Sequence, residues 1–114
     1  RTAGMSDDRL ADLAGSTLEL DDLIDYQDGA IVSRTLVDRE AATLTVFACD
    51  EGQTISEHTA PHEALLQVLD GTAKVTIDGT DYELQAGESI VFPADTPHAV
   101  AAVDRFKMLL TMVR

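Results

Sequence analysis

The strongest constraint on the fold is a repeated pattern of short strands and turns that runs from Ala30 to the C-terminus. Turn-forming residues interrupt this stretch at intervals of about 8–12 residues, a rhythm typical of β-sandwiches and barrels. Ala73, Val75 and Ile77 alternate with polar residues, as in a strand with one buried face. The Asp78-Gly79 pair that follows favours a tight type I′ hairpin. The sequence therefore predicts an all-β domain.

The final strand-like segment is apolar on both faces. Every second residue from Phe106 to Met112 is apolar, and Leu109 and Val113 add apolar side chains to the opposite face. A chain of 114 residues is expected to form a single domain with one core. We therefore expect a second copy of the protein to cover the outer apolar face, which predicts a homodimer.

The N-terminal part of the chain has a different texture. Residues 1–5 are interpreted as a cloning remnant before a native Met5. The segment from Ser6 to Gly15 has a capping serine, acids in its first turn and a terminal glycine, which together predict a short helix. We expect residues 6–29 to pack on a barrel formed by residues 30–114. Neither a secretory signal nor a membrane-spanning run is present, so the expected location is the cytoplasm, without a membrane partner.

The charge of the chain limits the classes of partner that it can bind. There are 21 acidic and 8 basic residues, and the formal net charge is −13. A polyanion repels phosphate backbones, so nucleic acid is excluded as a partner. Many aspartates with few lysines are typical of proteins from organisms with high internal salt, where the Debye length falls to about 3 Å at 1 M. The sequence therefore predicts a halophilic protein.

The chain lacks the sequence motifs of several classes of enzyme. The chain has no glycine-rich phosphate loop, no G-x-S-x-G elbow and no H-E-x-x-H helix. Cys49 is the only cysteine, so neither an intrachain disulfide nor a cysteine-rich zinc site can form. We expect its thiol to be buried and inert.

Two segments carry a family resemblance. They read GQTISEHTAPHEALLQVLDG and GESIVFPADTPHAVAA, and they resemble the two-part motif of the cupin superfamily. The residues in register are Gly52, His58, Gly71, Gly87, Pro93 and His98. The resemblance implies an antiparallel double-stranded β-helix, the jelly-roll barrel of cupins, here with a short N-terminal helix. It also implies frequent dimers and, in many members, a metal held by three histidines and one glutamate.

Departures from the motif affect the implied metal site. Ala60 stands at the position of the second histidine, and Ala64 stands at the position of the glutamate. The second motif also departs, with Asp95 at a usual glycine and Ala102 at a usual asparagine. Only two of the four metal-ligand positions of the family motif hold the family's residue, and these are His58 and His98.

We expect His58, His98 and His62 to line a pocket inside the barrel. His62 has the same parity as His58 in an extended chain, although Pro61 favours a bend, and an exposed loop histidine is the alternative. Three imidazoles suit zinc, copper, iron or nickel, and the family resemblance adds manganese. The expected cofactor is one divalent transition metal (Zn, Fe, Mn, Ni or Cu), and the alternative is that no metal is bound. On the parity of a regular strand, Glu63 points away from the pocket.

Three functions fit these residues. The first is binding of a small organic ligand in a histidine-lined pocket, because Ala60 and Ala64 widen the cavity and make it more apolar. The second is a metal-dependent oxygenase or isomerase that uses His58, His62 and His98 as ligands. The third is a metal-free enzyme in which a histidine acts as general acid or base.

Overall fold

The computed structural model describes residues 10–114. Its regular elements are two 3-10 turns and nine strands. In chain order they are η1 (Leu10–Leu13), η2 (Leu20–Leu23), β1 (Ile31–Asp38), β2 (Ala42–Cys49), β3 (Thr54–His58), β4 (Glu63–Asp70), β5 (Thr72–Ile77), β6 (Thr80–Gln85), β7 (Ser89–Phe92), β8 (His98–Ala102) and β9 (Phe106–Val113).

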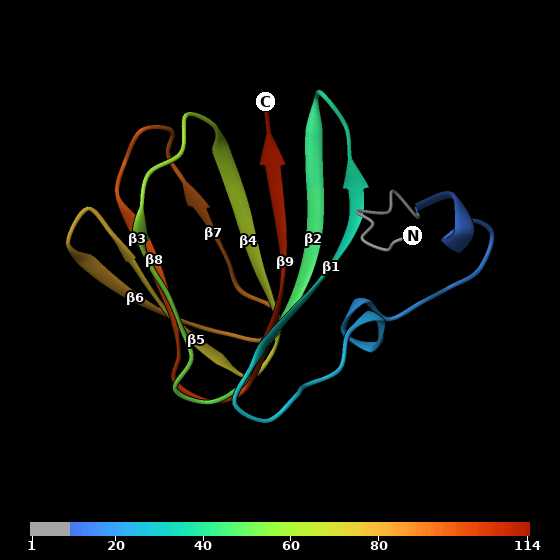
Figure 1. Cartoon of the computed structure of the whole chain (residues 1–114), viewed down its shortest axis with the longest axis horizontal. Coiled ribbons are helices and arrows are strands. Elements are labelled where there is room, and N and C mark those ends of the chain that lie inside the picture. The colour runs from blue at the N-terminus through green and yellow to red at the C-terminus, as the bar shows by residue number, and fades with distance from the viewer. Residues whose placement is uncertain (1–9) are drawn as a thin grey trace.

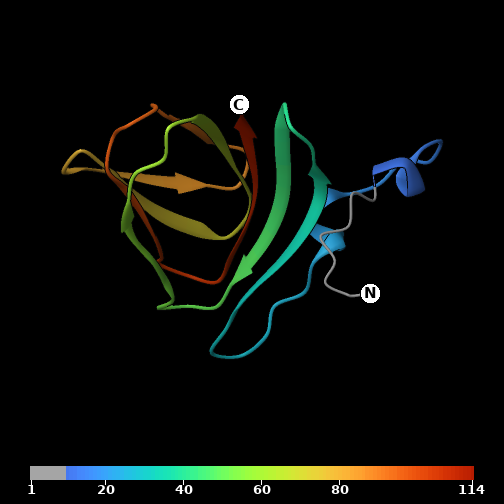
Figure 2. The same ribbon diagram turned by 45° about the horizontal axis from the view of Figure 1, so that its top comes forward.

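The strands form two sheets that face each other (Figure 1). One sheet has the order β1-β2-β9-β4-β7, and the other has the order β3-β8-β5-β6. All strand pairs in both sheets are antiparallel. In the turned view the strands close into a barrel, and residues 10–30, the N-terminal segment, lie outside β1 and β2 (Figure 2). This arrangement confirms the predicted all-β jelly-roll barrel.

The predicted hairpin joins β5 to β6. Asp78 has a φ of 49° and Gly79 a φ of 81°, and Ile77 pairs with Thr80 across the turn. Positive φ at both central residues is the requirement of a type I′ turn, whose twist matches that of the flanking strands. The local sequence therefore predicted this element correctly.

The main core lies between the two sheets. Its fully buried members include Phe106 and Met108 of β9 and Leu66 of β4, all at most 1% exposed. Leu110 packs against the same cluster, so the alternation expected for the last strand is present. Cys49 is also buried there, and burial raises the pKa of its thiol to about 11, in keeping with an inert side chain.

A second apolar cluster lies on the outer face of the five-stranded sheet. Leu109 of β9 packs there with Ile24, and Leu20 and Leu23 of η2 contact the same cluster. The N-terminal segment of the same chain thus covers part of this outer face. From the sequence, we expected a second copy of the protein to cover it.

The predicted N-terminal helix is small. Within the described residues it is a single 3-10 turn at η1, without a buried side chain, and Ser6 to Arg9 lie outside the described residues. A short helix gains little from propensity and needs a packed apolar face, which two leucines in four residues do not provide. No helical segment in residues 10–114 has the length and apolar character needed to cross a bilayer.

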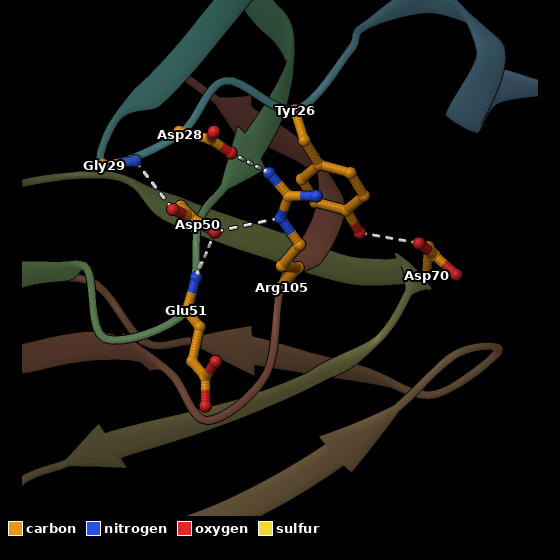
Figure 3. A network of polar contacts seen from close by, with 7 residues as sticks. All are labelled: Tyr26, Asp28, Gly29, Asp50, Glu51, Asp70 and Arg105. Carbon is orange, nitrogen blue, oxygen red and sulfur yellow. Dashed lines mark hydrogen bonds and ion pairs between the residues drawn. The ribbon is translucent and has the colours of Figure 1, made fainter.

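A polar network fastens the N-terminal segment to the barrel (Figure 3). Arg105, just before β9, contacts the carboxylates of Asp28 and Asp50, each at 2.9 Å. Its guanidinium also lies 4.8 Å from the centre of the Tyr26 ring, and the Tyr26 hydroxyl donates to Asp70 at 2.6 Å. Burial, and then the Asp70 carboxylate, raise the pKa of Tyr26 above its ordinary value.

Candidate functional site

A cavity of about 300 Å³ lies inside the barrel between the two sheets. Both sheets contribute to its wall, and almost every lining side chain is apolar. The lining residues are Ile31, Phe47, Ile55, His58, Leu66, Phe92, His98, Val100, Met108 and Leu110. The cavity is therefore a partly open hydrophobic pocket, and imidazole is the only polar group among its lining side chains. Of the two imidazoles, that of His58 is exposed and that of His98 is buried.

A turn between β7 and β8 presents His98 to this cavity. The turn contains Asp95 in a left-handed conformation, with φ of 60°, and the Asp95 backbone N–H donates to the Ala60 carbonyl at 2.7 Å. His98 follows as the first residue of β8 and is 7% exposed. Its ring stacks on Phe92, with centroids 4.3 Å apart and planes 8° apart. Packing and turn geometry together fix the orientation of this imidazole.

A bulge in β3 brings His58 to the same place. Ile55 pairs with Val100 and His58 pairs with His98, so two residues of β3 lie opposite the single residue Ala99 of β8. Side chains alternate along a regular strand, and without the extra residue Ile55 and His58 would point to opposite faces. Because of the bulge both line the cavity.

The two imidazoles contact each other and share a hydrogen-bonding pattern. Their ring centroids are 4.4 Å apart and their planes meet at 65°. His58 Nδ1 lies 2.9 Å from the Ser56 carbonyl oxygen, and His98 Nδ1 lies 3.1 Å from that of Thr96. A carbonyl oxygen only accepts, so Nδ1 must carry the proton in both rings. In each neutral ring Nε2 is then the nitrogen with a free lone pair.

The third histidine lies elsewhere. His62 is half-buried in the bend before β4, and it is not among the residues that line the cavity. Glu63 is exposed and borders an outer depression with Leu65 and Val91. Its side chain thus points away from the cavity, as strand parity predicts.

The side chains present do not fit the metal site that the resemblance implies. Ala64, at the position of the glutamate, packs against the interior core and offers only a methyl group. Within residues 10–114, the one group of three metal-ligating side chains close enough to share an ion is Glu19, Asp21 and Asp22, which lies at η2. A four-ligand set is therefore missing from the cavity, and two imidazoles are what remains.

Sequence reasoning missed most of the apolar wall. Ile31, Phe47 and Ile55 come from three different strands, and no motif marks them. Strand alternation could have assigned each to an inner or outer face, but only the pairing of the strands brings the three together.

Comparisons with known proteins agree with this architecture. The family described as "Cupin domain" matches residues 45–113. A conserved protein of unknown function from Streptococcus pyogenes is 40% identical, with a TM-score of 0.84 and coverage of 88% of either chain. A cupin superfamily protein from Desulfitobacterium hafniense is 27% identical, with a TM-score of 0.83, over 87% of this chain and 91% of that one.

A third structure is longer than this chain. A cupin 2 conserved barrel domain protein from Leptotrichia buccalis is 41% identical with a TM-score of 0.82, over 85% of this chain but 47% of its own. A search of curated proteins finds no match.

Proposed function

The chain belongs to the cupin domain family, and we propose that it binds a small organic ligand in the cavity lined by His58 and His98. The observation that carries this proposal is a chamber with an apolar wall and two oriented imidazoles. Ligand sites are typically apolar, with a few placed polar groups that fix the orientation of the ligand.

The size of the cavity limits the ligand. Its volume of about 300 Å³ lies at the lower end of the range of roughly 300–1,000 Å³ found for small-molecule sites. A compact molecule, such as a substituted benzene, fits this space better than a nucleotide or an oligosaccharide.

A cavity-filling substitution tests the proposal. Ile55 lines the cavity from the edge strand β3 and is half-buried, so an Ile55→Trp side chain can enter the cavity with little disturbance of the core. We expect small aromatic probes to shift the NMR signals of cavity residues in the unmodified protein and not in this variant. Val103→Trp, at an exposed position between β8 and β9 and outside the cavity wall, is the matched control and should leave binding intact. If no probe shifts any cavity signal, the proposal is wrong.

The metal-dependent enzyme is the second candidate. It is favoured by one observation, the hydrogen bonds that hold both Nδ1 atoms and leave both Nε2 atoms available, an orientation common among metal-binding histidines. It needs His62 to join the pair, or ligands from outside the chain. Elemental analysis of the purified protein beside His58→Ala and His98→Ala tests it. A stoichiometric metal lost in both variants would favour it over the ligand-binding proposal.

We also propose that the protein is a homodimer. Val91 and Val113 are 56% and 57% exposed, and with Leu65 they border a depression on the outer face of the five-stranded sheet. Exposed apolar side chains that lie together commonly mark contact surfaces. A second copy packed on these residues would cover what the N-terminal segment leaves open.

A further inference from the structure

The cavity lacks the groups that bind charged or highly hydroxylated molecules. No lysine, arginine, carboxylate, hydroxyl or amide side chain is among its lining residues. An anion would have no fixed counter-charge there, in a chain whose net charge is −13. A sugar would bury several hydroxyls without partners, which is unfavourable.

The two imidazoles restrict the ligand further. Each Nδ1 donates to a backbone carbonyl, of Ser56 for His58 and of Thr96 for His98. In the neutral rings both Nε2 atoms can therefore only accept a hydrogen bond. No buried side-chain nitrogen or oxygen in the described residues lacks a partner. Since no hydrogen bond in this part of the chain involves His98 Nε2, that atom is accessible to solvent or to a ligand.

We infer that the cavity binds a compact, uncharged and mostly apolar molecule that donates a hydrogen bond from one hydroxyl group, as a phenol does. The apolar wall accommodates the body of the ligand, and an imidazole Nε2 accepts from its hydroxyl. The inference rests on the proposed function and adds the chemical class of its ligand.

Three probes of similar shape separate the possibilities: phenol, toluene and benzoate. Their affinities are compared by NMR titration at about pH 8, where imidazole is ordinarily neutral. In a purely apolar cavity toluene binds more tightly than phenol, because burial of an unpaired hydroxyl is unfavourable. We expect the reverse order here, with phenol binding roughly five- to tenfold more tightly than toluene, as one net hydrogen bond allows. Benzoate should bind most weakly.

Variants assign the preference to the imidazoles. The double variant His58→Phe/His98→Phe keeps flat rings at both positions, including the ring that stacks on Phe92. We expect it to bind toluene at least as well as the unmodified protein does and to lose the preference for phenol. Binding of toluene also shows that the variant is folded.

The outcomes distinguish the inference from the function on which it rests. Equal or tighter binding of toluene in the unmodified protein overturns the inference and leaves a ligand-binding cavity. Tightest binding of benzoate overturns it in favour of an anionic ligand. If none of the three probes binds, the inference and the proposed function are both wrong.

Discussion

Among the glycines in residues 10–114, Gly71 is the one at which an added side chain would meet other atoms of the protein. It links β4 to β5 with a φ of +77°, a conformation that residues with a side chain rarely adopt. A Cβ built there would overlap the carbonyl oxygen of Arg105, which is a rigid backbone atom. The family glycine at this position therefore has two physical reasons, its dihedral angle and the close approach of a second backbone segment.

Two glycine substitutions separate these reasons. Gly79 has a φ of +81° but open space around its Cβ position. We expect Gly79→Ala to cost about 1 kcal/mol of unfolding free energy, which is the penalty of the left-handed conformation. Gly71→Ala should cost about 4 kcal/mol, because the backbone of one segment must also move. Urea unfolding measures both, and equal losses would show that the close approach has no energetic weight.

At the scale of elements, the polar network joins the N-terminal segment to the end of the barrel at which β2 ends and β9 begins, the lower end in Figure 1. Asp50 follows β2 and accepts from the Gly29 backbone N–H at 2.6 Å and from Arg105 at 2.9 Å. The backbone N–H of Gly29, then that of Glu51, and then the Arg105 guanidinium hold the pKa of Asp50 below its ordinary value. The segment that leads into Ile31, a lining residue of the cavity, is therefore attached through an ionised carboxylate.

The pH dependence of stability reports on this attachment. A depressed folded-state pKa means that the carboxylate stabilises the fold above the unfolded pKa of about 3.9, and that this contribution is lost as the pH falls further. We expect Asp50→Asn to be less stable at neutral pH and to lose less stability than the unmodified protein between about pH 5 and pH 2. Urea unfolding across this range is the measurement.

Asp28→Asn is the matched control, since Asp28 contacts the same guanidinium at the same 2.9 Å but has a fully exposed side chain. Exposed ion pairs contribute little to stability. This variant should therefore lose as much unfolding free energy as the unmodified protein between about pH 5 and pH 2. If all three proteins lose the same amount of stability on acidification, the role assigned to Asp50 is wrong.

At the scale of the whole molecule, the net charge of −13 means that repulsion between like charges destabilises the folded state. We expect the melting temperature to rise from dilute buffer to molar KCl, because a Debye length of about 3 Å at 1 M screens that repulsion. KCl is preferred to sulfate, which stabilises folded proteins in general by exclusion from their surface. A melting temperature that does not change with KCl would refute the halophilic prediction. The cytoplasmic location also stays a prediction.

The proposed dimer is tested at the same scale. Val91→Lys adds a charge to the outer face of the five-stranded sheet, and we expect it to convert a species of twice the chain mass into a monomer. Tyr82→Lys, on the opposite sheet and 44% exposed, should leave the mass unchanged. Sedimentation in molar salt measures both, and a monomeric unmodified protein would overturn the proposed dimer.

The sequence by itself determined the features that depend on local pattern. The hairpin at Asp78-Gly79 follows from two residues that tolerate positive φ, and the inner face of β9 follows from strict alternation. The spacing of the cupin motif selected His58 and His98, which meet in the cavity. These features depend on residues close together in the chain or on a register that the motif itself carries.

Only the tertiary structure decided which side chains share the cavity. His62 has the same parity as His58, yet β3 ends at His58 and the chain bends at His62 before β4 begins, so His62 is not in the cavity wall. Likewise Ile24 and η2 cover the outer face near Leu109. The alternation of residues in the last strand had predicted that a second copy of the protein covers this face. The physical reason is that strand parity holds only along an unbroken strand, whereas bulges and coverage depend on pairing with segments distant in sequence.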